Sequence, residues 1–154
     1  MSTHHGILLH VVFSTKRRKP LLANSWRDDL FAYIGGVIQD HRAVLLKSGG
    51  IEDHVHFLIR IHPAFAISKT IQLLKANSSK WINEQGKTIQ PFQWQRGYGA
   101  FSVSQSMTER VKTYIANQRE HHAKKTFEDE YLAMLKNHGV DFDPRYVFDQ
   151  ENVA

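Results

Sequence analysis

The alternation of apolar and polar positions along the chain predicts four strands and several helices. Apolar residues run almost without a break from Ile7 to Phe13, which is typical of a central strand covered on both faces. Apolar residues at helical spacing indicate helices elsewhere. In chain order the predicted elements are a strand over 5–14, a helix over 25–40, strands over 43–48 and 51–61, a helix over 66–84, and alternating strand-like stretches within 92–104.

The C-terminal third is predicted to be helical. A capping box at 106–109 opens a third long helix that runs to about Ala123, and a further helix follows over 127–137. Ser25 is the expected N-cap of the first helix. The tail over 138–154 carries no periodic pattern, so we assign it no regular structure.

The order β-α-β-β-α-β followed by helices predicts a fold of the α+β class. It is the ferredoxin-like arrangement, an antiparallel sheet with helices on one face, here extended by C-terminal helices. The first and third strands should then lie in the middle of the sheet. We expect one domain over 1–154, with a core over about 5–137, and expect the second face of the sheet to be open.

The third predicted strand carries an unusual row of polar residues. His54 and His56 are two residues apart, so they lie on one face at a separation of roughly 6–7 Å. Glu52 extends that row by one strand period, and Arg60 falls on the same face. Five apolar residues fall on the opposite face, namely Ile51, Val55, Phe57, Ile59 and Ile61.

Composition narrows the possible functions only a little. The chain has no cysteine, which excludes disulfides and thiolate zinc sites and fits a cytoplasmic protein. The first residues lack the order of a signal peptide, and no apolar run reaches the length of a membrane span, so we expect no membrane partner. The net charge of +5 is compatible with nucleic-acid binding but does not require it. The cluster from Lys16 to Lys19, taken alone, indicates a solvated loop.

The two histidines are candidate metal ligands. A His-hydrophobe-His triplet alone is more commonly an inert surface pair. Here the pair lies on the polar face of a strand expected to be central, where ligands are held stiffly. Two imidazoles with oxygen ligands suit a divalent ion such as Mg²⁺, Mn²⁺ or Zn²⁺, and ligand type does not decide among them.

The third long helix offers a further ligand and a nucleophile. Tyr114 and Gln118 lie one turn apart, within an apolar stripe that includes Val111 and Ile115. The alternative for Tyr114 is a core residue, and for Gln118 a hydrogen bond to the backbone. A phenol is a weak nucleophile at pH 7, but a divalent ion can polarise a phosphate oxygen. Tyrosine could then attack a phosphodiester and form a phosphotyrosine, which a DNA 3′-hydroxyl can displace without ATP.

These features resemble the single-tyrosine HUH transposases of bacterial insertion sequences and their relatives associated with repeated palindromes (REP). HUH denotes the His54-Val55-His56 triplet. The tyrosine lies downstream of the histidines, as in these transposases, whereas in relaxases it lies upstream. The resemblance covers about 10–135, and the matching stretches are 10–16, 53–58, 78–81, 92–104 and 114–122.

The resemblance implies a role for each matching residue. Tyr114 would be the catalytic nucleophile, and His54, His56 and Gln118 would bind Mg²⁺ or Mn²⁺ at the scissile phosphate. Glu52 would line the site. Relatives are homodimers that act on single-stranded DNA with hairpins, and the tyrosine helix of one subunit can complete the histidine site of the other. Plausible DNA contacts are Lys16, Arg17, Arg18, Lys19, Lys75, Lys80 and Arg96, with Tyr98 or Trp94 available to stack on a base.

The predicted function is therefore a transposase that cleaves hairpin-containing single-stranded DNA through a 5′-phosphotyrosine intermediate and rejoins strands. One alternative is an HUH nuclease that serves its host or initiates replication. A second is a non-enzymatic nucleic-acid-binding module of the same fold, although the middle strands lack the aromatic-rich motif of RNA readers. A third is a metal-dependent hydrolase, which would use water and trap no protein–DNA bond.

Overall fold

The computed structural model describes residues 1–148, so the last part of the predicted tail, 149–154, lies outside the described residues. The strands are β1 (Ile7–Ser14), β2 (Val44–Gly50), β3 (His54–Ile61) and β4 (Gly99–Val103). The α-helices are α1 (Asn24–Val37), α2 (Ile67–Glu84), α3 (Thr108–Ala116), α4 (Gln118–His122) and α5 (Phe127–Asn137). Short 3₁₀ turns are η1 (Lys16–Arg18), η2 (Ile38–His41) and η3 (Gln105–Met107).

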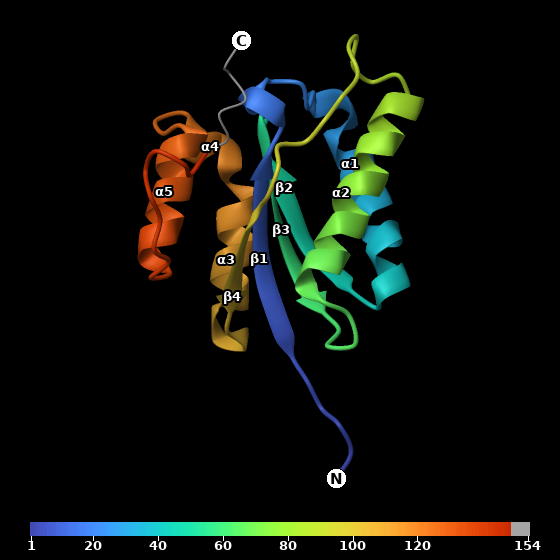
Figure 1. Cartoon of the computed structure of the whole chain (residues 1–154), viewed down its shortest axis with the longest axis vertical. Helices are drawn as coiled ribbons and strands as arrows, with labels where there is room; N and C mark the ends of the chain where they lie inside the picture. Colours follow the sequence, from blue (N-terminus) through green and yellow to red (C-terminus); the bar gives the residue numbers. More distant parts are fainter. Residues whose placement is uncertain (149–154) are drawn as a thin grey trace.

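The four strands form one antiparallel sheet in the order β2-β3-β1-β4 (Figure 1). This order and the element sequence confirm the predicted α+β, ferredoxin-like class, with β1 and β3 in the middle. The register pairs Ser14 with His54 and Val12 with His56. The two histidines therefore lie at the end of β3 that faces the end of β1, next to η1.

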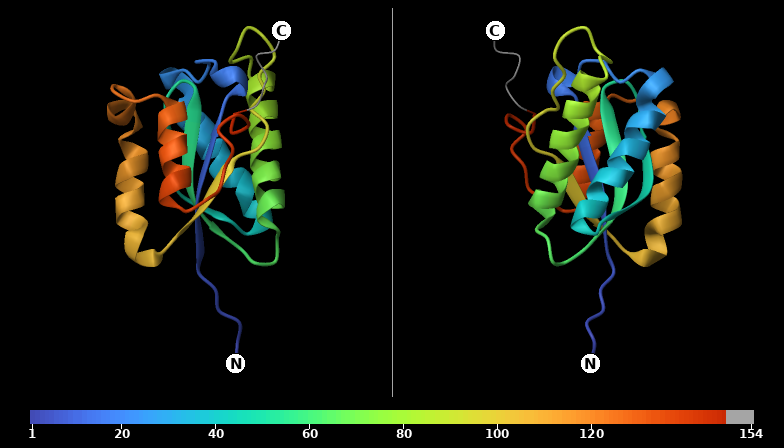
Figure 2. Two further views of the ribbon diagram at one scale, coloured as in Figure 1. Left: turned by 60° about the vertical axis from the view of Figure 1, so that its left-hand side comes forward. Right: turned by 90° about the vertical axis from the view of Figure 1, so that its right-hand side faces the viewer.

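Helices α1 and α2 cover one face of the sheet, where the main hydrophobic core lies (Figures 1 and 2). The alternation of β1 and β3 explains this face, because every second side chain points the same way. Leu9, Val11 and Phe13 from β1 pack with Val55, Phe57, Ile59 and Ile61 from β3.

The second face of the sheet is covered by α3, α4 and α5, as both views of Figure 2 show. The prediction that this face is open is therefore wrong. The apolar stripe of α3 packs on its own sheet, where Ile115 joins Leu8 and Leu58 in a small buried cluster. Phe127 and Met134 of α5 pack with Val12 and Phe101 in another cluster. This cover is the reason why His54 and His56 are fully buried.

Several predicted helix boundaries shift. Helix α1 begins at Asn24, and Ser25 is not its cap. The predicted capping box at 106–109 does not form, because Ser106 lies in η3 and the residue before α3 is Met107, which makes no capping bond. The third long helix is interrupted at Asn117, whose φ and ψ of −101° and 26° are not helical. Tyr114 and Gln118 thus belong to two successive helices.

The connection into β3 also differs from the prediction. Strand β2 continues through Gly49 and Gly50, and the turn falls at 51–53, closed by a bond from the Ile51 amide to the His54 carbonyl. In the 92–98 segment only Trp94 pairs with the sheet, through an isolated bridge to Thr15. The chain breaks from that pairing near Gly97, which has a positive φ of 71°.

Gly49 permits the close approach of α3 to β2. A Cβ at this position would collide with the backbone oxygen of Ile115 and lie 2.8 Å from its Cγ2. We expect Gly49→Ala to destabilise the fold by about 1–3 kcal/mol through overpacking and to displace α3. Thermal unfolding measures this effect. Gly36→Ala is the matched control, since a Cβ there meets nothing within 4 Å and should be neutral or stabilising. An equal loss in both variants would contradict the packing argument.

Within residues 1–148, no helix has both the length and the apolar character needed to cross a lipid bilayer.

Candidate active site

A cluster of polar side chains is buried between the sheet and the C-terminal helices. It combines His54 and His56 of β3 with Gln118 and His122 of α4 and Glu130 of α5. His54, His56 and Gln118 were predicted together from the sequence, and the fold brings them together. Burial of this many polar groups requires that they satisfy one another. We refer to these five residues as the cluster.

The atoms of the cluster converge on two oxygens. The Gln118 Oε1 lies 3.0 Å from His54 Nε2 and 3.2 Å from His122 Nε2. The Glu130 Oε1 lies 3.0 Å from His56 Nε2, 3.1 Å from His122 Nε2 and 3.3 Å from His54 Nε2. All three histidines therefore present the same ring nitrogen, Nε2, to the same small space.

The other ring nitrogens are held by neighbours that fix each ring. His54 Nδ1 donates to the Asp53 carboxylate at 2.7 Å, and His122 Nδ1 donates to the backbone oxygen of Lys125 at 2.6 Å. His56 Nδ1 lies 2.8 Å from Nε2 of His10, a buried residue of β1. Partners of this kind orient metal-binding histidines and leave the opposite nitrogen for the ion.

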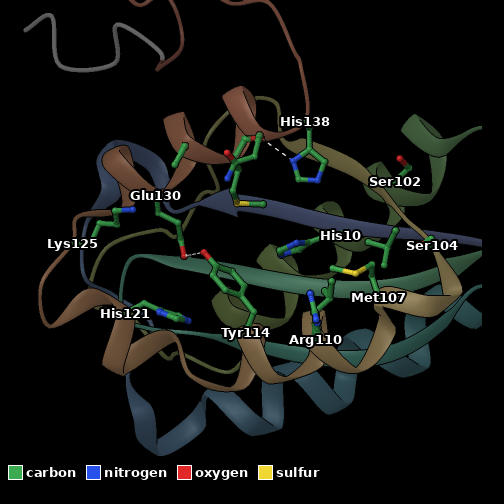
Figure 3. A pocket seen from close by; sticks show the side chains of 15 residues that line it. His10, Ser102, Ser104, Met107, Arg110, Tyr114, His121, Lys125, Glu130 and His138 are labelled. Atoms are coloured by element: carbon green, nitrogen blue, oxygen red, sulfur yellow. Dashed lines mark hydrogen bonds between the residues drawn. The ribbon is translucent and has the colours of Figure 1, made fainter.

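Tyr114 joins the cluster through Glu130. Its hydroxyl donates to Glu130 Oε2, the second oxygen of the carboxylate whose Oε1 faces the histidines (Figure 3). The Tyr114 ring also lies against His56, with ring centroids 5.8 Å apart. The predicted nucleophile and the predicted ligands of one chain therefore lie within a single hydrogen-bonded set.

Burial and close pairing set the charges of the cluster. Burial opposes ionisation of Glu130, but hydrogen bonds from three histidines hold its pKa well below the usual range. Burial disfavours a charge on His54, yet its bonds to Asp53 and Glu130 raise its pKa to about 9. Burial lowers the pKa of His56 to about 4, against the attraction of Glu130. Burial and Glu130 together raise the pKa of Tyr114 well above its ordinary range.

These shifts predict a stability maximum near pH 6.5 for the metal-free protein. His54 is protonated in the fold up to about pH 9, so stability falls as pH rises from 6.5 to 9. His56 and His10 stay neutral down to about pH 4 and 3, whereas the unfolded chain binds those protons below 6.5. Stability therefore also falls as pH drops below 6.5. Each difference of one bound proton between the folded and the unfolded chain should lower Tm by about 3–5 °C per pH unit. Thermal unfolding in the presence of a chelator measures this change.

A His54→Asn variant tests the origin of the alkaline side of this profile. It should lose the fall in Tm between pH 6.5 and 9, whereas His4→Gln, at an exposed position before β1, should keep the wild-type profile. A wild-type Tm that is constant from pH 6.5 to 9 would contradict the charge assigned to His54.

The cluster has the composition and spacing of a divalent-metal site. His54, His122 and Glu130 alone place three ligand atoms within 4.8 Å of one another. Neighbouring ligands about 2.1 Å from a six-coordinate ion lie about 3 Å apart, close to the separations of 3.0–3.3 Å within the cluster. Imidazole nitrogens, a carboxylate and an amide oxygen are all ligands that divalent metal ions accept in proteins.

Glu52 does not lie in the row with the histidines. Strand β3 begins only at His54, so Glu52 falls in the preceding turn and strand alternation does not apply to it. Its carboxylate accepts a hydrogen bond from Arg119 of α4 at 2.5 Å, and its backbone oxygen accepts from Leu22. Glu52 thus ties α4 to the turn before β3, next to the cluster but outside its ligand atoms.

The predicted DNA contacts fall into two groups. Those in and around η1 lie at the same end of the sheet as His54, since Ser14 pairs with His54 and η1 follows directly. Arg17 and Arg18 adopt positive φ angles of 60° and 55°. Arg18 forms an ion pair with Glu128 of α5 at 2.7 Å, and Lys16 donates to the Gln93 side chain.

The second group is scattered. Lys75 and Lys80 lie on α2, on the opposite face of the sheet from the cluster. The Lys75 ammonium donates to the backbone oxygens of Gln95 and Gly97, so it supports the loop before β4. Arg96 and Tyr98 are exposed in that loop. Trp94 is buried in the main core and donates to the Ser78 hydroxyl, so it does not present its ring to a base.

Glu130, His122, Asp53 and His10 join the site without having been assigned to it from the sequence. A signal for Glu130 was available, because it falls within the apolar stripe of its helix between Phe127 and Met134. His10 similarly interrupts an apolar strand. His122 lies one turn after Gln118, but the break at Asn117 changes the helical phase, so the sequence alone does not show in which direction it points.

The sequence of this chain is similar to those of transposases of insertion sequences. The family model described as IS200-like transposase matches residues 3–118. The transposases for insertion sequence element IS200 of Salmonella typhimurium and Salmonella typhi are both 26% identical over 117 residues, which cover 72% of this chain and 76% of each relative.

Two solved structures share the fold. One is a Deinococcus radiodurans protein regarded as a transposase, with a TM-score of 0.62 and 22% identity, covering 77% of this chain and 95% of that one. The other is a REP-associated tyrosine transposase bound to a REP hairpin, with a TM-score of 0.55 and 15% identity, covering 75% and 70%.

Proposed function

Because this chain belongs to the family of IS200-like transposases, we propose that it cleaves single-stranded DNA and rejoins strands with Tyr114 as the nucleophile. The family implies a DNA-binding enzyme of transposition. The observation that carries the finer proposal is the hydrogen bond from the Tyr114 hydroxyl to Glu130 within the cluster.

In the proposed reaction the Tyr114 oxygen attacks the phosphorus of a phosphodiester. The bond from phosphorus to the 3′-oxygen breaks, and this oxygen leaves as a 3′-hydroxyl after taking up a proton in place of the one that the phenol gave up. The strand that carries the 5′-phosphate stays on Tyr114. Glu130 Oε2 already accepts the Tyr114 proton in a hydrogen bond, so it is the nearest acceptor when the phenol reacts. A 3′-hydroxyl of another strand then displaces the tyrosine and restores a phosphodiester.

The cluster is the proposed site of a divalent ion, Mn²⁺ or Mg²⁺. We assign as ligands His54, His56 and Gln118, and add His122 and Glu130 on the grounds of their distances. When bound, such an ion would draw charge from a phosphate oxygen and make the phosphorus more reactive. The hydrogen-bond partners of the histidine Nδ1 atoms would keep the Nε2 ligand atoms in place, and the C-terminal helices would exclude water.

The proposed substrate is single-stranded DNA that contains a hairpin. Support comes from the structurally similar transposase that was solved with a REP hairpin. The cations of η1 and Arg96, with Tyr98, are the proposed contacts, because they lie near the end of the sheet that carries His54 or in the loop before β4. A host-serving nuclease would use the same chemistry, and the DNA that flanks the gene would distinguish it from a mobile element.

A homodimer remains a proposal, in which two chains exchange their tyrosine helices. One chain here brings its own Tyr114 to its own cluster, so exchange is not required for a complete site. Mixing Tyr114→Phe chains with His56→Ala chains tests this. Restored cleavage in the mixture would establish sites shared between two chains. If the mixture does not cleave while the wild-type protein does, each site lies within one chain.

The test of the proposed function is incubation with labelled hairpin DNA and Mn²⁺, followed by denaturing electrophoresis and mass spectrometry. We expect a protein–DNA adduct on Tyr114, and much less with a fully duplex control of the same sequence. Cleavage without any adduct would indicate a hydrolase. Binding without cleavage would indicate a non-enzymatic module.

A further inference from the structure

A pocket of about 660 Å³ lies beside the cluster, between β4, α3 and α5 (Figure 3). We call it the α3–α5 pocket. Its volume falls within the range of about 300–1,000 Å³ that is usual for small-molecule sites. Val103, Met107, Val111, Ala133 and Met134 supply apolar walls. Tyr114 and Glu130 lie at its inner end, so the pocket opens directly onto the proposed nucleophile.

Flat rings border the inner end of this pocket. His121 stacks on Tyr114, with centroids 4.6 Å apart and planes 30° apart, and His10 lies edge-on to Tyr114 at 6.0 Å. The Nε2 atom of His121 is buried and has no hydrogen-bond partner among the described residues. A buried polar nitrogen without a partner is unusual in a folded protein and points to a missing ligand group.

Two cations stand at the pocket without an acidic partner. Arg110 of α3 and Lys125, in the loop before α5, both line it, and in Figure 3 they lie on either side of Tyr114. Within residues 1–148 neither side chain forms an ion pair, in contrast to Lys112 of α3, which pairs with Glu109. The pocket thus offers apolar walls and rings for a flat group, with positive charge on both sides.

We propose that the α3–α5 pocket holds one nucleotide of the substrate strand, one of the two that flank the scissile phosphate. The base lies against Met107, Val111 and Met134, with His121 Nε2 at its polar edge. Arg110 and Lys125 bind the neighbouring phosphates. This inference rests on the proposed function, because it takes the phosphate at Tyr114 as its reference point. It adds that the protein draws a base out of the strand next to the cleaved bond.

The first test replaces single nucleotides of the hairpin substrate by abasic residues, at each of the three positions on either side of the cleaved bond. Removal of the base at one flanking position should slow adduct formation by roughly 5-fold to 100-fold, the range expected for a lost stacking contact. Removal at the outer positions should change the rate by less than about 2-fold. Equal rates at all six positions would overturn the proposal.

The second test fills the pocket from α5. Ala133→Leu keeps a strong helix former and should slow adduct formation on the intact substrate by roughly tenfold. It should have little further effect on the substrate that lacks the flanking base, because the two changes remove the same contact. Ala116→Leu, at an exposed position of α3 outside the pocket, is the control. Equal slowing of both substrates by Ala133→Leu would contradict the proposal.

The third test concerns the cations. Arg110→Met and Lys125→Met should each lower the salt dependence of single-strand binding by about 0.7 in log–log slope. Their neighbours provide matched controls, Lys112→Met and Lys124→Met, which should leave the slope unchanged. A protein that forms no adduct with any substrate would refute the proposed function. Normal adducts with unchanged slopes and no abasic effect would refute only the pocket.

Discussion

A Tyr114→Phe protein is expected to bind hairpin DNA with wild-type affinity and to form no covalent adduct with it. The substitution removes one oxygen, and the ring keeps its contacts with His56 and His121. If the phenol is the nucleophile, no neighbouring group replaces it, and cleavage should fall by at least about 10⁴-fold. Single-turnover cleavage in Mn²⁺, with binding measured separately in chelator, measures both quantities.

Tyr33→Phe is the matched control for this experiment. Tyr33 lies in α1 on the opposite face of the sheet, where it stacks on Trp81. It should cleave at the wild-type rate. Wild-type cleavage by Tyr114→Phe would show that another group attacks the phosphate. Loss of both binding and cleavage, with an altered Tm, would instead assign Tyr114 to the core.

Binding of Mn²⁺ to the cluster is expected to raise the Tm of the wild-type protein by about 6–16 °C. An ion at 100 to 1,000 times its Kd stabilises the fold by about 3–4 kcal/mol, and each kcal/mol is worth about 2–4 °C in a chain of this size. Glu130→Gln removes the only carboxylate of the cluster. We expect this variant to lose most of the shift and to require at least about 100-fold more Mn²⁺ for half of the wild-type shift.

Glu128→Gln distinguishes a ligand from any nearby acid. Glu128 is two residues away on α5 and pairs with Arg18 rather than with the cluster. It should keep the full Mn²⁺ shift, measured against its own metal-free Tm. A full shift in Glu130→Gln would restrict the ligands to the histidines and Gln118. The absence of a shift in wild-type protein with Mn²⁺, Mg²⁺ and Zn²⁺ would remove the metal from the proposed mechanism.

The sheet could be predicted from sequence because two of its strands have unambiguous patterns. The continuous apolar run of β1 and the alternation of β3 determine which strands are central and which side chains share a face. The helices that cover His54 and His56 could not be placed on the sheet in the same way. Its helices are short, and the direction in which α3, α4 and α5 fold back on the sheet depends on turns such as Asn117 and on the close approach allowed by Gly49.

The candidate site likewise contains some residues that could be predicted from the sequence and others that could not. His54 and His56 follow from strand period, and Gln118 from its place on an apolar stripe. Glu130 lies 74 residues after His56, and only the packing of α5 on the sheet brings them together. Strand period also misplaced Glu52, because the alternation was extended through a turn. Local periodicity therefore predicts directions within an element, whereas contacts between elements require the fold.

The two left-handed arginines of η1 have a consequence for the tolerance of this chain to change. A non-glycine residue in that conformation costs about 1–2 kcal/mol, and Arg17 and Arg18 adopt it in succession. Glycine at either position would relieve the strain but remove a cation beside the cluster. Selection for thermal stability alone, with no selection for DNA binding, should therefore replace these two arginines early. If natural populations retain the two arginines, this indicates that DNA binding is still under selection.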